Sequence, residues 1–314
     1  MGSNNSNNNS NKKFSFKVKW SNDKYTKRSI LSDIARIFDP FGWLIPLTIT
    51  NKIFMRELWA QNLTWDDPLS PELVKKWESI KQKFNSIEKL RLSRFVITDN
   101  CPEEIENLYL KKGQSISIKN INQLGNSNYY ISFDRLKNQP IELHGFCDAA
   151  KDCYTAVVYM TGNAKPIILM AKNRLAPIKN SQSIPRLELC SCVLLSELML
   201  EIKKTLPDKF KNVKTHYWSD SQVALAWIVN GNGPTQYIKT RVNKIRKNSE
   251  ISQWSYVSTD QNPADLGTRP NKVSSELLLE SDLWWYGPKF LRSKEWPKTI
   301  VLTTTIDSLS VERN

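Results

Sequence analysis

IELHGFCDA (141–149), CYTAVVYMT (153–161) and KPIILMAKNR (165–174) are the stretches that decide the fold. The first alternates apolar and polar residues, and all three are rich in the β-branched and aromatic residues that favour strands. Short turns separate them along the chain. We therefore predict three consecutive antiparallel strands, beginning at residue 141.

The residues that follow alternate between helical and strand patterns. Leu187, Leu194, Leu195 and Leu198 fall on or near one face of a helix predicted over 187–202. Further on we expect a strand at 213–220, a helix at 221–229 capped by Ser221, a basic helix at 237–248, a strand at 252–258 and a last helix beginning at Pro263. This order predicts an α/β fold with a mixed five-stranded sheet flanked by helices.

The segment before this sheet has a different character. Helical spacing over 29–38 ends at Asp39-Pro40, because a residue before proline avoids the helical conformation. Two more helices are predicted over 46–60 and 71–90. We interpret residues 26–98 as a small helical module that shows no chemistry of its own.

The remaining segments have no sustained period. The domain boundaries that we expect are a disordered Asn/Ser-rich tail at 1–25, the helical module at 26–98, a linker or insertion at 99–140, the sheet domain at 141–272 and a C-terminal extension at 273–314.

Composition points towards a polyanionic partner. The 314 residues contain 45 Lys and Arg against 31 Asp and Glu, a net charge of +14. A positive field of this size concentrates nucleic acid, although a merely soluble basic protein would have the same composition.

The numbers and spacing of the cysteines and histidines bear on metal binding and on the redox compartment. The five cysteines include no CxxC pair, and there are two histidines, His144 and His216, so no structural zinc site is expected. An odd cysteine count in a long chain suits a reducing compartment. Neither a secretory signal nor an apolar run long enough for a membrane span occurs, so we expect a cytoplasmic or nuclear protein without membrane contact.

Four acidic residues stand where predicted elements end or begin. Asp148 ends the first strand, Glu188 lies in the first turn of the first long helix, Asp220 ends the fourth strand, and Asp265 opens the last helix. Taken singly, each has an ordinary structural role, as a turn residue, a helix cap or a partner of the helix dipole. They converge only if strands one and four are neighbours.

Clustered carboxylates repel one another unless a cation lies between them. Mg²⁺ or Mn²⁺ prefers such oxygen ligands and leaves positions open for water and phosphate. Two such ions would clamp a phosphodiester during hydrolysis without any nucleophilic side chain. Asp148, Glu188, Asp220 and Asp265 are therefore our candidate catalytic residues and ligands of two metal ions.

Several long motifs resemble a known family in order and content. Those that resemble the ribonuclease H domain of Pao/BEL-type LTR retrotransposon polyproteins are HGFCDAA (144–150), PRLELCSCVLLSEL (185–198), YWSDSQVALAWI (217–228) and NPADLGTRP (262–270). The helical block is similar to the segment after the reverse transcriptase palm in those elements, on KRSILSDIARIFDPFGWLIPLTITNKIFMRELW (27–59) and LTWDDPL (63–69). LWWYGPKFL (283–291) resembles the stretch that leads towards their integrase.

This resemblance implies a ribonuclease H fold, two divalent ions and an RNA–DNA hybrid as substrate. Asp148, Glu188, Asp220 and Asp265 match the four catalytic carboxylates of the family. The reverse transcriptase palm and fingers and the integrase of a parent polyprotein would be partners. The alternative is an inactive remnant that only binds nucleic acid.

The chain also departs from related chemistries. It has no YxDD polymerase motif, and no histidine follows near Asp265. An aspartic-peptidase name is often attached to this family, but neither Asp-Thr-Gly nor Asp-Ser-Gly occurs in the chain. Peptidase chemistry therefore has no support in the sequence.

Basic and polar residues near the predicted strand and helix ends are candidates for contacts with nucleic acid. They are Lys172, Asn173, Arg174, Arg186, Ser221, Gln222, Arg241 and Lys244. For the helix at 237–248, a solvated basic face is an equally simple interpretation.

Overall fold

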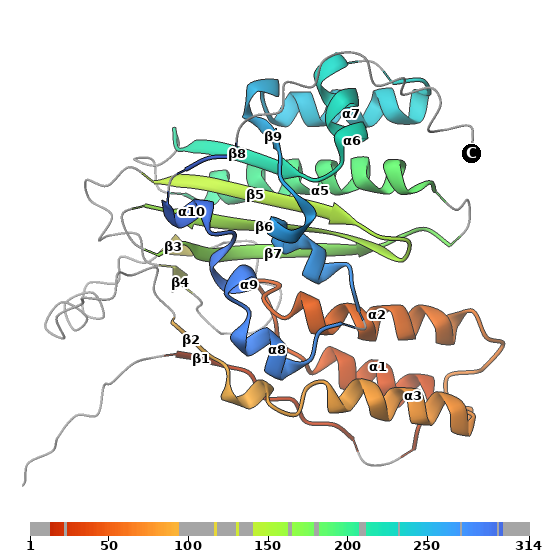
Figure 1. Ribbon diagram of the computed structural model, residues 1–314. Coiled ribbons are helices and arrows are strands. Elements are labelled where there is room, and N and C mark those ends of the chain that lie inside the picture. The colour runs from red at the N-terminus through yellow and green to blue at the C-terminus, as the bar shows by residue number, and fades with distance from the viewer. Residues whose placement is uncertain are drawn as a thin grey trace, which may run out of the picture.

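A mixed five-stranded sheet lies at the centre of the fold (Figure 1). The computed structural model describes residues 13–21, 24–93, 116–117, 130–131, 141–162, 165–178, 182–206, 212–231, 233–270, 272–293 and 295–297. The strands, in spatial order, are β7 (Ile167–Leu175), β6 (Cys153–Thr161), β5 (Glu142–Ala149), β8 (Lys214–Ser219) and β9 (Trp254–Tyr256).

The pairing of these strands confirms the predicted fold class. β5, β6 and β7 form the predicted antiparallel meander, while β8 pairs parallel to β5 and β9 parallel to β8. The order is that of a ribonuclease H-like sheet, with its first and fourth strands adjacent. Adjacent strands one and four are the condition that the carboxylate hypothesis needs.

One face of the sheet is covered by α5 (Ile184–Thr205), beyond which lie α6 (Gln222–Asn230) and α7 (Gln236–Asn248) (Figure 1). Gly145 allows close approach, since a Cβ there would lie 2.5 Å from Leu195 Cδ1. Cys147 Sγ lies 3.7 Å from Cys192 Sγ. Odd-numbered β5 residues therefore face α5, and even-numbered ones face away from it.

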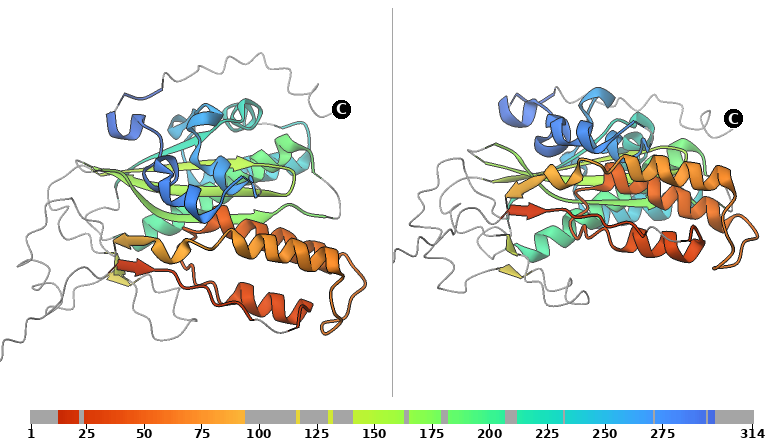
Figure 2. Two further views of the ribbon diagram at one scale, coloured as in Figure 1. Left: turned by 60° about the horizontal axis from the view of Figure 1, so that its bottom comes forward. Right: turned by 90° about the horizontal axis from the view of Figure 1, so that it is seen from below.

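The helical module packs against β7, which is one of the two edge strands of the sheet. Its helices are α1 (Lys27–Ala35), α2 (Ile45–Trp59) and α3 (Pro71–Gln82), which form a layer beside the sheet in the left view of Figure 2. The turn before α2 covers the edge of β7, because Ala171 N donates to Phe41 O (2.8 Å) and Trp43 Nε1 donates to Leu169 O (3.2 Å). Gly42, with φ +73°, permits this contact, since a Cβ would lie 2.0 Å from Ala171 O.

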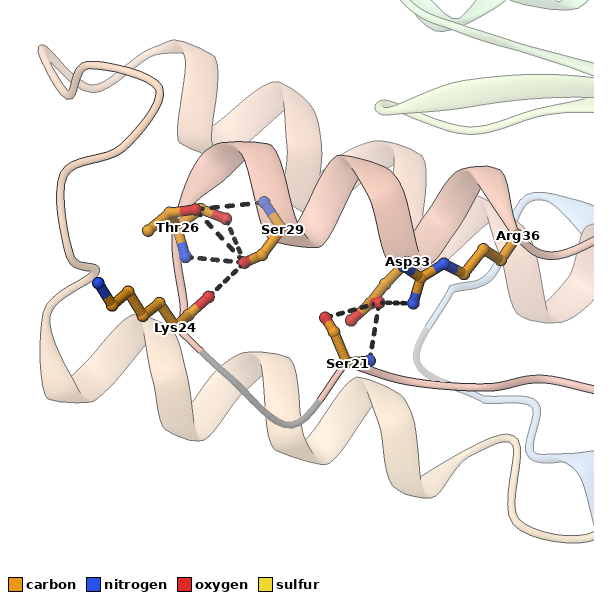
Figure 3. A network of polar contacts seen from close by, with 6 residues as sticks. All are labelled: Ser21, Lys24, Thr26, Ser29, Asp33 and Arg36. Atoms are coloured by element: carbon orange, nitrogen blue, oxygen red, sulfur yellow. Dashed lines mark hydrogen bonds and ion pairs between the residues drawn. The ribbon is translucent and has the colours of Figure 1, made fainter.

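A polar network at the start of α1 ties down the chain before it (Figure 3). Thr26 and Ser29 form a capping box, in which each side chain accepts from the backbone N–H of the other. Ser21 donates from both N (2.9 Å) and Oγ (2.8 Å) to Oδ1 of Asp33. Arg36 pairs with the same oxygen at 3.3 Å.

The expected disordered tail over 1–25 is wrong for residues 13–21. β1 (Lys13–Ser15) pairs with β2 (Arg91–Ser93), Phe16 is buried, and the ring of Trp20 lies 5.5 Å from that of Trp77. Two aromatic side chains supply apolar area that the Asn-rich composition conceals. Residues 1–12 lie outside the described residues.

Two other predicted segments differ in length or position. The helix predicted over 71–90 ends at Gln82 and is followed by a 3-10 turn, η1 (Ile87–Lys89). Most of the predicted linker at 99–140 lies outside the described residues, apart from the pair β3 (Ile116–Ser117) and β4 (Tyr130–Ile131).

The segment after β8 ends in short helices. 3-10 turns form at η4 (Ile251–Gln253), η5 (Thr259–Gln261) and η6 (Pro263–Gly267), followed by α8 (Ser275–Glu280), α9 (Asp282–Tyr286) and α10 (Phe290–Ser293). The expected last helix at Pro263 is thus a single 3-10 segment. It ends at Gly267, where a Cβ would lie 2.6 Å from Thr155 and 3.1 Å from Ile45.

None of the helices in the described residues is long and apolar enough to cross a bilayer.

Candidate active site

Asp148 is the most buried of the four predicted carboxylates, with 8% exposure at the end of β5. Its Oδ2 accepts a short hydrogen bond from Thr268 Oγ1. Burial is the largest cause that raises the pKa of Asp148 to about 7, and the negative charges of Asp220 and Asp265 raise it further.

Asp220 directly follows β8, next to Asp148 across the sheet. The simpler interpretation, that Asp220 caps the following helix, is wrong: Ser221 is the cap, and its Oγ accepts from Ala224 N at 3.1 Å. Asp220 Oδ2 instead accepts from Thr259 Oγ1 at 2.9 Å. Burial raises the pKa of Asp220, with a smaller contribution from the charge of Asp265.

Glu188 reaches the group from α5. Glu188 was predicted in the first turn of this helix. Because the helix begins at Ile184, Glu188 lies in its second turn instead. Its Oε2 accepts from Ser221 Oγ at 2.5 Å. Burial raises the pKa of Glu188, and the charge of Asp220 adds to this.

Asp265 completes the group from η6, where Arg269 Nε donates to its Oδ1 at 2.5 Å. Thr268 links this segment to β5, because its Oγ1 contacts both Asp148 Oδ2 and Asp265 O. Asn262 Nδ2 donates to Cys147 O at 3.0 Å. Thr268 and Asn262 were not among the predicted site residues, although both lie in the motif NPADLGTRP.

The helical module braces this end of the sheet. Thr50 Oγ1 donates to Pro270 O at 2.7 Å, just after the Asp265 segment. Arg56 Nη1 donates to Asp152 O at 3.0 Å and to Ala176 O at 3.3 Å, in the turn after β5 and at the end of β7. The module therefore holds the loops around the carboxylates in place.

The donor set of this site suits hard divalent cations, because all four side chains offer carboxylate oxygens. The raised pKa values of Asp148, Glu188 and Asp220 reflect burial first and the charge of neighbouring carboxylates second, and a cation would relieve that repulsion. The oxygens do not form a closed cage: in the described part of the chain, the triad whose ligand atoms all lie within 4.8 Å is elsewhere, at Glu142, His144 and His216. An open group of this kind leaves room for substrate oxygens.

The raised pKa of Asp148 predicts a pH dependence of stability without metal. A carboxyl with a folded pKa of about 7 and an ordinary value near 3.8 binds its proton more tightly in the folded state. Its contribution to the free energy of unfolding therefore falls, on the order of a few kcal/mol, as pH rises from about 4 to about 7. Chemical denaturation at several pH values, with a chelator present, measures this.

His144 contributes the opposite slope over nearly the same range. Burial lowers its pKa to about 4 from 6.5, so its contribution to stability is lost as pH falls from about 6.5 to about 4. The pH dependence of the free energy of unfolding of the wild type alone therefore does not separate the two groups. The difference between wild type and Asp148→Asn isolates the carboxyl, and a difference that stays constant from pH 4 to pH 7 would contradict the prediction.

Three of the predicted nucleic-acid contacts are engaged with α5. Lys172 pairs with Glu201, while Lys244 and Arg174 both pair with Glu197. All three basic side chains are more than 40% exposed, so the pairs are solvated and weak.

A second group lies between α5 and α7, where its α5 residues, Arg186 and Cys190, are each two positions from Glu188. Arg241 Cζ lies 3.3 Å and Arg186 Cζ 5.2 Å from the ring centre of Tyr237. Arg241 Nε donates to Cys190 Sγ at 3.3 Å, and within the described residues no carboxylate lies within 4 Å of Arg241.

The other predicted contacts are divided. Asn173 Oδ1 accepts from Lys52 Nζ at 2.6 Å. Ser221 is buried, and its hydroxyl is already hydrogen-bonded to Glu188 and to the backbone of the helix that it caps. Gln222 beside it is exposed.

Solved ribonuclease H structures are among those similar to the chain. The N-terminal RNase H domain of rv2228c from Mycobacterium tuberculosis, solved as a fusion with maltose-binding protein, is 9% identical over 44% of this chain and 94% of that chain, with a TM-score of 0.31. LC11-RNase H1 in complex with an RNA/DNA hybrid is 12% identical over 44% and 99%, with a TM-score of 0.31. RNase H1 from Halobacterium salinarum NRC-1 is 9% identical over 40% and 89%, with a TM-score of 0.28.

Sequence comparison identifies the family. No curated protein matches the chain. The family model described as the Pao retrotransposon-like RNaseH-like domain matches residues 26–110 and 115–221, more than half of the chain. The match includes the helical module as well as Asp148, Glu188 and Asp220. The chain therefore belongs to the family of Pao retrotransposon-like RNaseH-like domains.

Proposed function

We propose that this protein is a metal-dependent endonuclease that hydrolyses the RNA strand of RNA–DNA hybrids. The observation that supports the proposal is the electrostatic contact among carboxylates from four separate elements: Asp148 feels the charges of Asp220 and Asp265, and Glu188 feels that of Asp220. Carboxylates with pKa values raised by burial and by one another's charge are typical of sites that bind cations or perform catalysis.

Asp148, Glu188, Asp220 and Asp265 would hold two Mg²⁺ or Mn²⁺ ions. When bound, such ions activate water and stabilise the charge that develops on a phosphodiester. The chain's own contribution is positioning. Thr268 orients Asp148, Ser221 orients Glu188, and Thr259 orients Asp220, each through one hydroxyl group.

Substrate binding is proposed beside this group, on the surface formed by Arg186, Tyr237 and Arg241. Arg241 has no carboxylate partner in the described residues, so its guanidinium can contact a phosphate. Gln222, exposed next to Asp220, is positioned for a 2′-hydroxyl. The reverse transcriptase palm and fingers and the integrase of a parent polyprotein are proposed as further partners.

The full chain is expected to cleave a labelled RNA–DNA hybrid in Mg²⁺ or Mn²⁺ and to leave duplex DNA of the same sequence intact. A chelator should abolish cleavage, because carboxylates alone cannot activate water. The control Asp282→Asn should cleave normally, since this 71% exposed side chain lies in α9 and carries no charge into the site. Gel electrophoresis of the labelled RNA strand measures all three.

Salt-sensitive hybrid binding without cleavage in either metal would reject the nuclease. It would support the alternative, a remnant that binds nucleic acid through its positive charge.

A further inference from the structure

Three side chains of types that can hold a metal ion lie together at the opposite end of β5 from Asp148. Glu142 and His144 belong to β5, and His216 belongs to β8. His144 and His216 are register partners on parallel strands, so they occupy the same face of the sheet. Their rings stack with centroids 4.7 Å apart and planes inclined by 4°.

The two imidazoles converge on one carboxylate at the outer limit of hydrogen-bonding distance. Nε2 of His144 and Nε2 of His216 each lie 3.5 Å from Glu142 Oε2, and neither forms a hydrogen bond of normal geometry. His144 is fully buried, with 0% exposure. A buried polar atom without a partner is costly and calls for a missing one.

Distance and surroundings separate this triad from the carboxylates of the proposed nuclease site. His144 and Asp148 are four residues apart on one strand, which corresponds to about 13 Å. Trp296 covers the triad, with its ring 4.9 Å from that of His144 and 5.1 Å from that of His216. The triad is thus partly covered, with His144 fully buried and Glu142 and His216 at 25% and 32% side-chain exposure.

A purely ionic role does not account for the arrangement. An ion pair brings its partners into close hydrogen-bonded contact, whereas each imidazole Nε2 stays 3.5 Å from Glu142 Oε2. Lys214 Nζ, the nearest permanent cation, lies 4.0 Å from the other oxygen, Glu142 Oε1. Neutral imidazole is the form that binds metals.

We propose that Glu142, His144 and His216 bind one divalent cation of the zinc class, which cross-links β5 to β8. One atom from each residue lies within 4.8 Å of the others, a spacing that small side-chain rotations close around an ion. Two imidazole nitrogens and a carboxylate suit Zn²⁺ or Co²⁺ and disfavour Mg²⁺. β5 and β8 also carry Asp148 and lead to Asp220, so the cross-link would stabilise the strands that hold both.

Binding through Nε2 has a consequence for Trp218. Its Nε1 lies 3.4 Å from His144 Nδ1, which acts as the acceptor. Coordination at Nε2 places the imidazole proton on Nδ1, where it opposes the Trp218 donor. The contact must therefore lengthen, and tryptophan fluorescence should change as the metal binds.

The test is a Co²⁺ titration of the full chain, followed by visible absorption with excess Mg²⁺ present to occupy the carboxylate site. We expect one Co²⁺ per chain, displaced by Zn²⁺, and a higher melting temperature with Zn²⁺. Glu142→Gln and His216→Gln should each weaken binding by more than the roughly 10–100-fold typical for loss of an outer-shell partner. Asp148→Asn should bind Co²⁺ like wild type.

No binding by wild type, or equal affinity in both variants and wild type, would overturn the proposal. Cysteine ligation would appear as a thiolate absorption band that both variants retain, which also counts against it. Circular dichroism establishes that each variant is folded. If His216→Gln does not fold, the Glu142→Gln variant still tests the proposal, because Glu142 is partly exposed (25%) and its substitution disturbs the core less. Hybrid cleavage is not measured, so failure of the proposed nuclease leaves the result unaffected.

Discussion

Asp148→Asn is expected to reduce hybrid cleavage by at least about a thousandfold. Bound cations supply several kcal/mol of transition-state stabilisation, and about 1.4 kcal/mol corresponds to a factor of ten in rate. Asp148 interacts with the charges of both Asp220 and Asp265, so its loss removes a proposed ligand that lies close to two of the others. Single-turnover cleavage of the labelled hybrid, at saturating enzyme, measures the rate.

The same substitution should raise stability in the absence of metal at neutral pH and above. Asparagine keeps the shape and can still accept from Thr268 Oγ1, while it removes one of the mutually repelling charges. Denaturation with a chelator at pH 8 checks this gain, and Asp282→Asn is again the control. A variant that loses both activity and stability would show that Asp148 has a structural role instead.

Much of the sheet could be predicted because its signals are local. Alternation over 141–149 and the apolar runs at 153–161 and 165–174 correspond to β5, β6 and β7 to within about two residues. Helix ends were less predictable. Glu188 shifted from the first to the second turn, since the proline near the start of α5 allowed the helix to begin earlier.

The carboxylate group could be predicted only as a set of candidates, because its members are far apart in the sequence. Sequence order indicated which acids end strands, but the neighbours that orient them depend on tertiary contacts. Thr268 is one hydroxyl among many until η6 places it against Asp148. Thr50, from a module without apparent chemistry, reaches the same loop.

The histidine triad shows a limit of motif reading. The absence of CxxC spacing argued against a zinc site, but strands offer another pattern. Glu142 and His144 are two residues apart and share a face, and His216 joins them through the parallel pairing of β5 with β8. That pairing is not contained in any local spacing.

The C-terminal segment was expected to be an extension beyond the domain, yet its described helices are part of the core. Trp284 in α9 is fully buried between the helical module and the sheet. Its Nε1 donates to Trp43 O at 2.9 Å, and its backbone O accepts from Tyr159 Oη at 2.7 Å. α9 therefore joins the module that braces the site to the strand next to β5.

Trp284→Ala should accordingly lower the free energy of unfolding by about 3–5 kcal/mol, the usual cost of emptying a buried tryptophan site. The exposed control Trp59→Ala, at 62% exposure, should change it by no more than about 0.5 kcal/mol. Urea denaturation followed by circular dichroism compares the two. Equal losses would mean that residues 273–293 only rest on the domain. A much larger loss at Trp284 means that this segment contributes to the stability of the folded core, because Trp284 contacts both the module and the sheet.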